Sequence, residues 1–327
     1  MAFYIVQVLA PVFWAIPINW PGQKFVDLQL TVHSPLRAGM IHDSETAHRF
    51  SDSSIAMVQR NFFVLEADLT PAAMLVKFTI LVDRLRCIVG QSRMTANYAG
   101  LATVDKLPDE EPLQIETTPV GNRLYSPRFW STPLTKKNIN EAAVSSALPP
   151  SFLFLCDASA AFLNNDYVRT ILYSAFAVES ISLTVLDQTY DLERNREQSP
   201  TTLRIVKDGG SAELRDPVFA FLRERGKFLN MLHELPLYLV GKSLLFENSS
   251  NYQTAAALYK TRNMLAHLAI VPDEDKYLTT DANGAEKALR CAVEIFGWWG
   301  YPVERFLAPL SAEFLDSSFF AEAIEPT

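Results

Sequence analysis

The stretch Leu153–Ser180, which reads LFLCDASAAFLNNDYVRTILYSAFAVES, decides the fold of the second half of this 327-residue chain. Its apolar residues recur every three or four positions, as they do in a helix with one buried face. The polar residues Asn164–Asp166 interrupt the pattern and supply the cap of a second helix. We therefore predict a helical region over Asp157–Asn195 with one break. The residues predicted to be buried in its second part are Val168, Ile171, Leu172, Ala175, Phe176, Val178 and Ile181.

The rest of the C-terminal half shows the same helical spacing. Asp216-Pro217 is typical of a helix start, because Asp caps the first turn and Pro is tolerated at the first helical position. Further helices are predicted over Phe219–Gly226, over Phe228–Leu245 with a break at Pro236, over Tyr252–Leu268 and over Ala282–Trp299. We predict an all-α bundle over residues 149–302, followed by an acidic C-terminal tail over residues 303–327.

Residues 1–148 carry strand patterns, and we predict an α+β domain there. Thr70 and Pro71 start a helix that ends at Gly90. Seven prolines punctuate the connection between residues 105 and 151, which favours a domain boundary between residues 148 and 149. The predicted strands cover Phe3–Leu9, Val12–Ile18, Lys24–Val32 and Asn61–Ala67, with weaker ones over Ala99–Val104 and Leu113–Thr118 and a polar loop over His33–Ser54.

The cysteines and the N-terminal residues bear on the cellular compartment. Cys87, Cys156 and Cys291 give no disulfide framework. The first 23 residues carry no charge, but they lack the basic segment of a signal peptide, and prolines at positions 11, 17 and 21 interrupt them. No segment is predicted to be long and apolar enough to span a membrane. We expect a cytoplasmic protein that does not contact a membrane.

The charge is divided unevenly between the two halves. Residues 151–327 hold 16 Lys and Arg against 24 Asp and Glu and so carry the whole net charge of −8, while residues 1–150 hold 13 of each sign. Affinity for RNA depends largely on Lys and Arg contacts to phosphate, so this chain is not a general basic RNA binder. Residues 194–227 hold eight basic residues against five acidic ones, and this patch could contact RNA locally. The alternative interpretation is an ordinary solvated helix face.

The hexapeptide Arg262–His267, which reads RNMLAH, is the motif that carries chemistry. Asn263 and His267 are four residues apart and share one face of the predicted helix. Arg262 lies one residue round the helix, and its long side chain can reach the same face. A cation, an amide and an imidazole gathered in this way could hold a phosphate and move a proton near neutral pH.

This motif resembles that of the HEPN family, an all-helical domain defined by an Arg and a His with four to six residues between them and often a polar residue after the Arg. Here Arg262 and His267 are the pair and Asn263 is the polar follower. The motif lies on the penultimate long helix, as in the family. Leu153–Ser180 is similar to the family's opening helices, with Glu179 in the acidic position. The resemblance covers about residues 150–300 and implies a HEPN-like helical bundle.

The resemblance also implies a reaction. Active HEPN domains are metal-independent endoribonucleases in which the motif helices of two protomers form one site, and they leave a 2′,3′-cyclic phosphate and a 5′-hydroxyl. His267 would then act as general base or acid, Arg262 would stabilise charge on the scissile phosphate, and Asn263 would orient His267 or bind the phosphate. Glu179 and Tyr259 are predicted as supporting residues. No metal and no cofactor are predicted.

The predicted function is therefore a bacterial toxin or antiphage-defence ribonuclease. Its partners would be RNA, a second copy through the helical domain, and an antitoxin or a defence complex. Family members paired with nucleotidyltransferase antitoxins carry a Tyr two residues after the His, where this chain has Ala269, so transfer of AMP to that position is disfavoured. The alternatives are a non-catalytic dimerisation or scaffold module, in which Arg262 pairs with a group such as Glu179, and a subunit of a larger defence complex.

A second cluster of His and acidic residues is a candidate metal site. It consists of His33, His42, Asp43, Glu45 and His48. The spacing fits no closed structural zinc site, so a polar loop that contains a few histidines is favoured.

Overall fold

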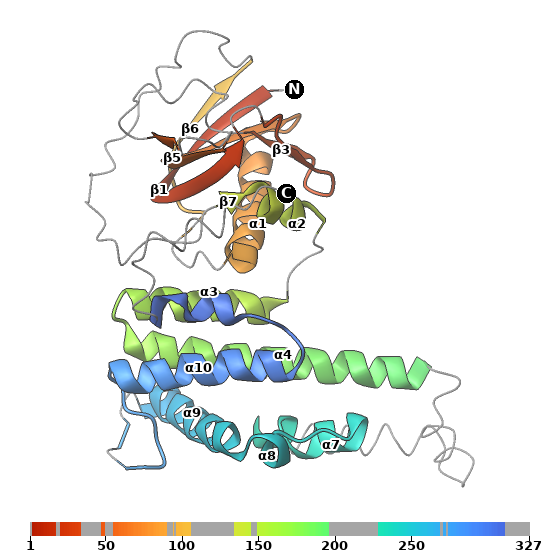
Figure 1. The fold of residues 1–327 in the computed structure, drawn as a ribbon, viewed down its shortest axis with the longest axis vertical. Helices are drawn as coiled ribbons and strands as arrows, with labels where there is room; N and C mark the ends of the chain where they lie inside the picture. The colour runs from red at the N-terminus through yellow and green to blue at the C-terminus, as the bar shows by residue number, and fades with distance from the viewer. Residues whose placement is uncertain are drawn as a thin grey trace. The chain divides into compact units, whose positions relative to one another are not determined.

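The chain divides into two compact units, one within Met1–Leu148 and the other over Pro149–Leu310. The first combines strands and helices, and the elements described in the second are all helical, so the predicted order of an α+β part and a helical part is confirmed (Figure 1). The computed structural model describes residues 2–17, 20–33, 47–49, 55–89, 94, 96–105, 134–144, 149–195, 228–268, 271–272 and 274–310.

An antiparallel sheet of five strands in the order β2-β3-β5-β1-β6 forms the first unit. Its two longest strands, β1 (Ala2–Pro17) and β5 (Ile55–Ala67), are neighbours. Two short strands extend the sheet, since β4 pairs with β5 and β7 runs parallel to β1. The remaining strands are β2 (Gln23–Phe25), β3 (Leu30–His33), β4 (Ala47–Arg49), β6 (Tyr98–Val104) and β7 (Leu134–Thr135).

The turn predicted between two N-terminal strands is wrong, because β1 is one continuous strand. Its register against β5 shifts between Gln7 and Val12, so an irregular stretch within the strand takes the place of the turn. Pro11 falls inside this irregular stretch, where the ladder does not require its missing N–H group. Alternate residues of β1 still face one core, which is why its buried positions include Val6, Trp14 and Ile16.

The stretch Lys24–Val32 is a hairpin, where a single strand was predicted. β2 and β3 pair with each other, and the chain reverses between them with Gln29 in the left-handed region at φ 58°. The amide of Gln29 donates to the carbonyl of Val26 (3.2 Å) and closes the turn. The predicted loop before Ser54 likewise contains the short strand β4. The predicted strand Leu113–Thr118 lies outside the described residues.

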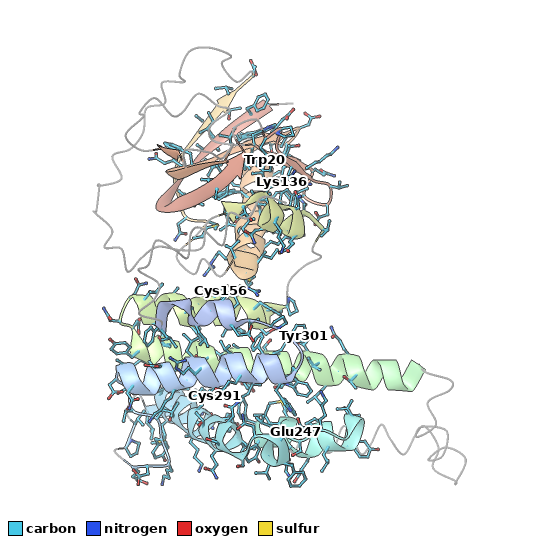
Figure 2. The ribbon with its side chains drawn as sticks, viewed as in Figure 1. Trp20, Lys136, Cys156, Glu247, Cys291 and Tyr301 are labelled. Carbon is cyan, nitrogen blue, oxygen red and sulfur yellow. The ribbon has the colours of Figure 1, made fainter. Side chains whose placement is uncertain are left out.

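Helices α1 (Pro71–Val89) and α2 (Lys136–Val144) contribute to the same core as this sheet (Figure 1). α1 begins at the predicted residue, with the Thr70 hydroxyl accepting from the amide of Ala73 (3.4 Å). Phe78 from α1 meets Phe63 of the sheet edge to face, with ring centroids 5.2 Å apart. Figure 2 labels Trp20 and Lys136 in this unit.

Helices α3 (Pro150–Leu163) and α4 (Tyr167–Asn195) form the helical hairpin that the opening stretch predicts. The predicted break is observed: Asn165 adopts a left-handed φ of 59°, and the Asp166 carboxylate accepts from the amide of Arg169 (3.2 Å). α3 starts at Pro150, earlier than the predicted Asp157, because Pro fits the first turn of a helix.

α4 is the central helix of the second unit, because it contacts α3, α9 (Ser249–Leu268) and α10 (Ala282–Trp298) (Figure 1). Its buried residues Ile171, Val178 and Ile181 are among those the sequence predicts. Asp281 caps the start of α10, and its carboxylate accepts from the amide of Gly284 (2.9 Å). Figure 2 labels Cys156 on α3 and Cys291 on α10, both buried.

The helix predicted over Phe228–Leu245 with a break at Pro236 is corrected to three short helices: η2 (Phe228–Met231), α7 (Glu234–Val240) and α8 (Leu244–Glu247). Pro236 lies inside α7, and the breaks fall before Glu234 and after Val240. Gly241 ends α7 with φ 72°, which is a conformation that glycine adopts without strain. The Ser243 hydroxyl then caps α8 by accepting from the amide of Phe246 (3.4 Å). The helix predicted from Asp216-Pro217 lies outside the described residues.

The helical unit does not end at residue 302, where the acidic tail was predicted to begin. A short 3-10 helix, η3 (Glu304–Leu310), packs against α3 and α10. Val303 and Phe306 are buried to 1% and 0% exposure. The hydroxyl of the buried Ser159 on α3 also donates to the carbonyl of Phe306 (3.2 Å). The sequence-based boundary is therefore corrected to Leu310, because the acidic composition of this segment concealed its apolar anchors.

One helical stretch among the described residues is long and apolar enough to cross a membrane, by length and composition alone. It is Tyr167–Thr189 within α4, with a mean hydropathy of 1.3, so the expectation that no segment is long and apolar enough is wrong in those terms. Half of its most apolar window is buried inside the structure. That burial fits its place as the central helix of the bundle.

Candidate functional site

Helix α9 carries the motif and is anchored just before it. The hydroxyl of Thr261, which is fully buried, donates to the carbonyl of Ala257 (2.8 Å) and accepts from the amide of Leu278 (2.8 Å). The segment that leads into α10 is thereby tied to the turn of α9 that precedes Arg262. The position of the motif is consequently set by a hydrogen bond across 17 residues as well as by apolar packing.

Arg262 forms the centre of the site. One guanidinium nitrogen donates to the Glu179 carboxylate on α4 (3.0 Å), and the other donates to the side-chain oxygen of its neighbour Asn263 (2.9 Å). The side chains of Arg262 and Glu179 keep 23% and 33% of their surface exposed. The structure therefore brings together three of the predicted residues, Arg262, Asn263 and Glu179. The ion pair between Arg262 and Glu179 remains accessible to solvent.

Aromatic rings surround the Arg262 guanidinium. Its central carbon lies 5.2 Å from the ring centroid of Phe176 and 5.8 Å from that of the predicted supporting residue Tyr259. The Tyr259 ring stacks on Phe228 at 4.8 Å with an interplanar angle of 6°. We call Phe176, Tyr259 and Phe228 the aromatic shelf. Because cation–π contacts favour a charge over the face of a ring, the shelf stabilises the guanidinium in this position.

Two members of the aromatic shelf were missed as site residues. Phe176 was predicted only to be buried, and Phe228 was assigned only to a helix. Helical spacing could have indicated Phe176, because it stands three residues before Glu179 and therefore faces the same side of α4. Tyr259 precedes Arg262 by the same interval on α9. No comparable signal exists for Phe228, which lies 31 residues before Tyr259 in the chain.

His267 stands apart from these groups. It is exposed in the last turn of α9, and no hydrogen bond or ion pair to it is found within the described part of the chain. The Arg262 guanidinium contacts Asn263, which shares a face of α9 with His267, while Glu179 and the aromatic shelf hold it beside α4. Among the described residues no hydrogen bond joins Arg262 to His267. Five residues of helix separate the two Cα directions by about 140°, whereas Asn263 and His267 differ by only about 40°.

Most of the second His and acid cluster lies outside the residues whose side chains the structure describes. His33 lies in the first unit, where its Nε2 atom contacts the Glu66 carboxylate at 2.8 Å. Residues 42, 43 and 45 lie outside the described residues. A search of the described residues finds no group of three or more His, Cys, Asp or Glu side chains that could hold a metal ion. The basic patch over residues 194–227 also lies outside the side chains described.

A separate polar cluster fixes the short helices near α9. Nδ1 of His233 lies 2.7 Å from the Ser243 hydroxyl, which is itself buried. The Glu247 carboxylate accepts from the Ser243 amide (3.2 Å) and from the indole of Trp298 on α10 (2.8 Å), and Figure 2 labels Glu247 on α8. Because the Ser243 hydroxyl also caps α8, these contacts serve to hold the short helices in place. The cluster presents no exposed nucleophile.

Comparison of the chain with known protein families, with curated proteins and with solved structures finds no match. The site must therefore be interpreted from its own residues. Those residues offer a cation held in a fixed place, an amide beside it, and an exposed imidazole within one helical turn of that amide. Such groups can bind an anion and transfer a proton.

Proposed function

We propose that the chain is an endoribonuclease of the HEPN type that acts as a homodimer without a metal. The observation that supports this proposal is the state of the motif on α9. Arg262 and Asn263 are in contact and held in place, while His267 is exposed and free of hydrogen bonds among the described residues. A general base or acid must be accessible to the substrate, and His267 meets that condition.

The proposed chemistry assigns one role to each group. His267 takes the proton of a ribose 2′-hydroxyl, whose oxygen attacks the neighbouring phosphorus, and the 5′-oxygen leaves with a proton from a second acid or from water. Arg262 stabilises the negative charge that develops on the phosphate oxygens. Asn263 faces the same side of α9 as His267 and donates to the phosphate or orients the imidazole. The products are a 2′,3′-cyclic phosphate and a 5′-hydroxyl.

Two copies would supply a complete set of groups. Within one chain the Arg262 guanidinium contacts Glu179 on α4, and the Cα directions of Arg262 and His267 differ by about 140° around α9. A two-fold axis near the end of α9 would place His267 of one protomer opposite Arg262 of the other. The end of α9 suits such a contact, because Leu268 beside His267 leaves 61% of its surface exposed.

The alternative is a non-catalytic dimerisation or scaffold module, including a subunit of a larger defence complex. The observation that favours it is the Arg262–Glu179 ion pair, which satisfies part of the guanidinium inside a single chain. A bacterial toxin or antiphage role, with an antitoxin or defence complex as partner, belongs to the proposal in either form.

The test is RNA cleavage by the purified full chain in the presence of EDTA. Wild type should cleave, His267→Ala should not, and Gln253→Ala on the same helix should cleave like wild type because that exposed side chain lies about 21 Å away along α9. Products should carry 5′-hydroxyl ends that a polynucleotide kinase phosphorylates without prior dephosphorylation. Equal cleavage by wild type and His267→Ala would refute the proposal, and so would cleavage by neither.

A further inference from the structure

We infer that Glu179 is a built-in competitor that occupies the phosphate-binding position of Arg262 in the free protein and must be displaced by the RNA backbone. This inference rests on the proposed ribonuclease function and concerns the regulation of the same site. A carboxylate and a phosphate present similar anionic oxygens to a guanidinium, so Arg262 cannot direct the same N–H groups to both.

The first support is the way the guanidinium is held. Besides Glu179, it donates to Asn263 (2.9 Å) and lies near the rings of Phe176 and Tyr259 at 5.2 and 5.8 Å. These contacts do not depend on the carboxylate, so they keep the cation in place when the carboxylate leaves. An Arg that is already oriented loses less side-chain entropy when it binds an anion.

The second support is the accessibility of the pair. Glu179 keeps a third of its side-chain surface exposed and Arg262 about a quarter, at 33% and 23%. Ion pairs that solvent can reach contribute little net stability, and a phosphate can compete for them. The Nε atom of Arg262 is buried and has no hydrogen-bond partner in the described part of the chain, so Glu179 does not engage the whole guanidinium.

The third support is the distribution of charge. Residues 151–327 carry the entire net charge of −8, which opposes RNA binding at long range. A carboxylate in contact with the one motif cation adds a local barrier to that general repulsion. Glu179 would therefore restrict the site to ligands that offer several phosphate contacts at once, and it would exclude single anions such as inorganic phosphate.

The experiment measures binding of a short 2′-O-methyl RNA oligomer, which lacks the 2′-hydroxyl that cleavage requires. Glu179→Gln keeps the shape of the side chain and removes its charge, and it should bind this oligomer about three- to fivefold more tightly than wild type. Glu286→Gln is the matched control, because it removes the same charge from an exposed ion pair with Arg290 on α10. It should bind like wild type.

The role of Arg262 is tested in the same assay. The gain from Glu179→Gln should vanish in the double variant Glu179→Gln, Arg262→Ala, and the slope of log affinity against log salt concentration should fall by about 0.7 for the lost phosphate contact. A gain that persists without Arg262 would assign it to general charge, and the absence of any gain would show that Glu179 does not compete. Either result overturns the inference.

Thermal unfolding of each variant separates competition from a structural role. If Glu179→Gln does not fold, Glu179→Ala is measured in its place, and failure of both to fold would overturn the inference in favour of a purely structural ion pair. The proposed function is judged independently by cleavage of ordinary RNA. Binding that depends on Arg262 without cleavage would refute the ribonuclease and keep the competitor, whereas cleavage that depends on His267 without a gain in Glu179→Gln would do the reverse.

Discussion

The strongest prediction about stability concerns Phe306 in η3, a residue that the sequence assigned to a tail. Its side chain is fully buried, and its carbonyl accepts a hydrogen bond from the Ser159 hydroxyl on α3. Replacing a buried Phe by Ala removes its apolar contacts and leaves a cavity, which costs about 3–5 kcal/mol. A domain of ordinary stability has only about 5–15 kcal/mol, so Phe306→Ala should remove a large fraction of it.

Urea unfolding followed by tryptophan fluorescence measures this loss, because Trp298 and Trp299 lie at the end of α10 in the same unit. With a slope of about 2 kcal/mol per M, the unfolding midpoint should fall by about 2 M. Glu304→Ala is the control, since Glu304 is an exposed residue of η3 and its loss should change the free energy of unfolding by less than about 0.5 kcal/mol. A loss below about 1 kcal/mol for Phe306→Ala would refute the placement of η3 in the core.

Three further predictions follow from particular contacts. Thr261→Val should lower the free energy of unfolding by about 1–3 kcal/mol, because it leaves the buried amide of Leu278 without an acceptor; an unchanged urea midpoint would contradict this anchor. Asp27→Asn should cost at most about 1 kcal/mol at pH 7: the hydrogen bond and the charge of Arg84 lower the pKa of Asp27, but Asp27 is half exposed and solvent screens the pair. That contribution is present above the unfolded pKa and is lost as the pH falls through the lower folded pKa, so stability curves of wild type and variant should converge below about pH 4 and not above it. The Cys291 thiol should resist a thiol reagent until the protein is unfolded in urea, because burial raises its pKa; rapid labelling of the native protein would show an opening of the helical unit.

The long helices could be predicted from the sequence because their signals are local. Apolar spacing and the Asn164–Asp166 cap are enough to place α3 and α4, and Thr70 with Pro71 places the start of α1. The irregular stretch of β1 could not be predicted in this way. A proline within an apolar run looks like a turn, and only the pairing with β5 shows that the strand continues through it.

The candidate site was predicted in part for the same reason. Asn263 and His267 share a side of α9 because helix geometry alone decides it. The direction of the Arg262 side chain depends on Glu179, which lies 83 residues earlier in the chain, and on the rings of Phe176 and Tyr259. The Tyr259 ring is in turn stacked on Phe228 of η2. Such contacts arise from tertiary packing. The motif residues can therefore be identified from the sequence, but the contacts of their side chains cannot.

The divergence of Arg262 and His267 makes a further prediction about the proposed dimer. If His267 of one protomer works with Arg262 of its partner, then Arg262→Ala and His267→Ala should each be inactive alone but regain activity when mixed and allowed to exchange subunits. Half of the dimers formed at random are mixed, and each of these holds one intact pair out of two, so about a quarter of the wild-type rate should return. RNA cleavage by the mixture measures it. A mixture as inactive as its components, beside an active wild type, would show that both groups act within one chain, which requires Arg262 to leave Glu179 and turn toward His267.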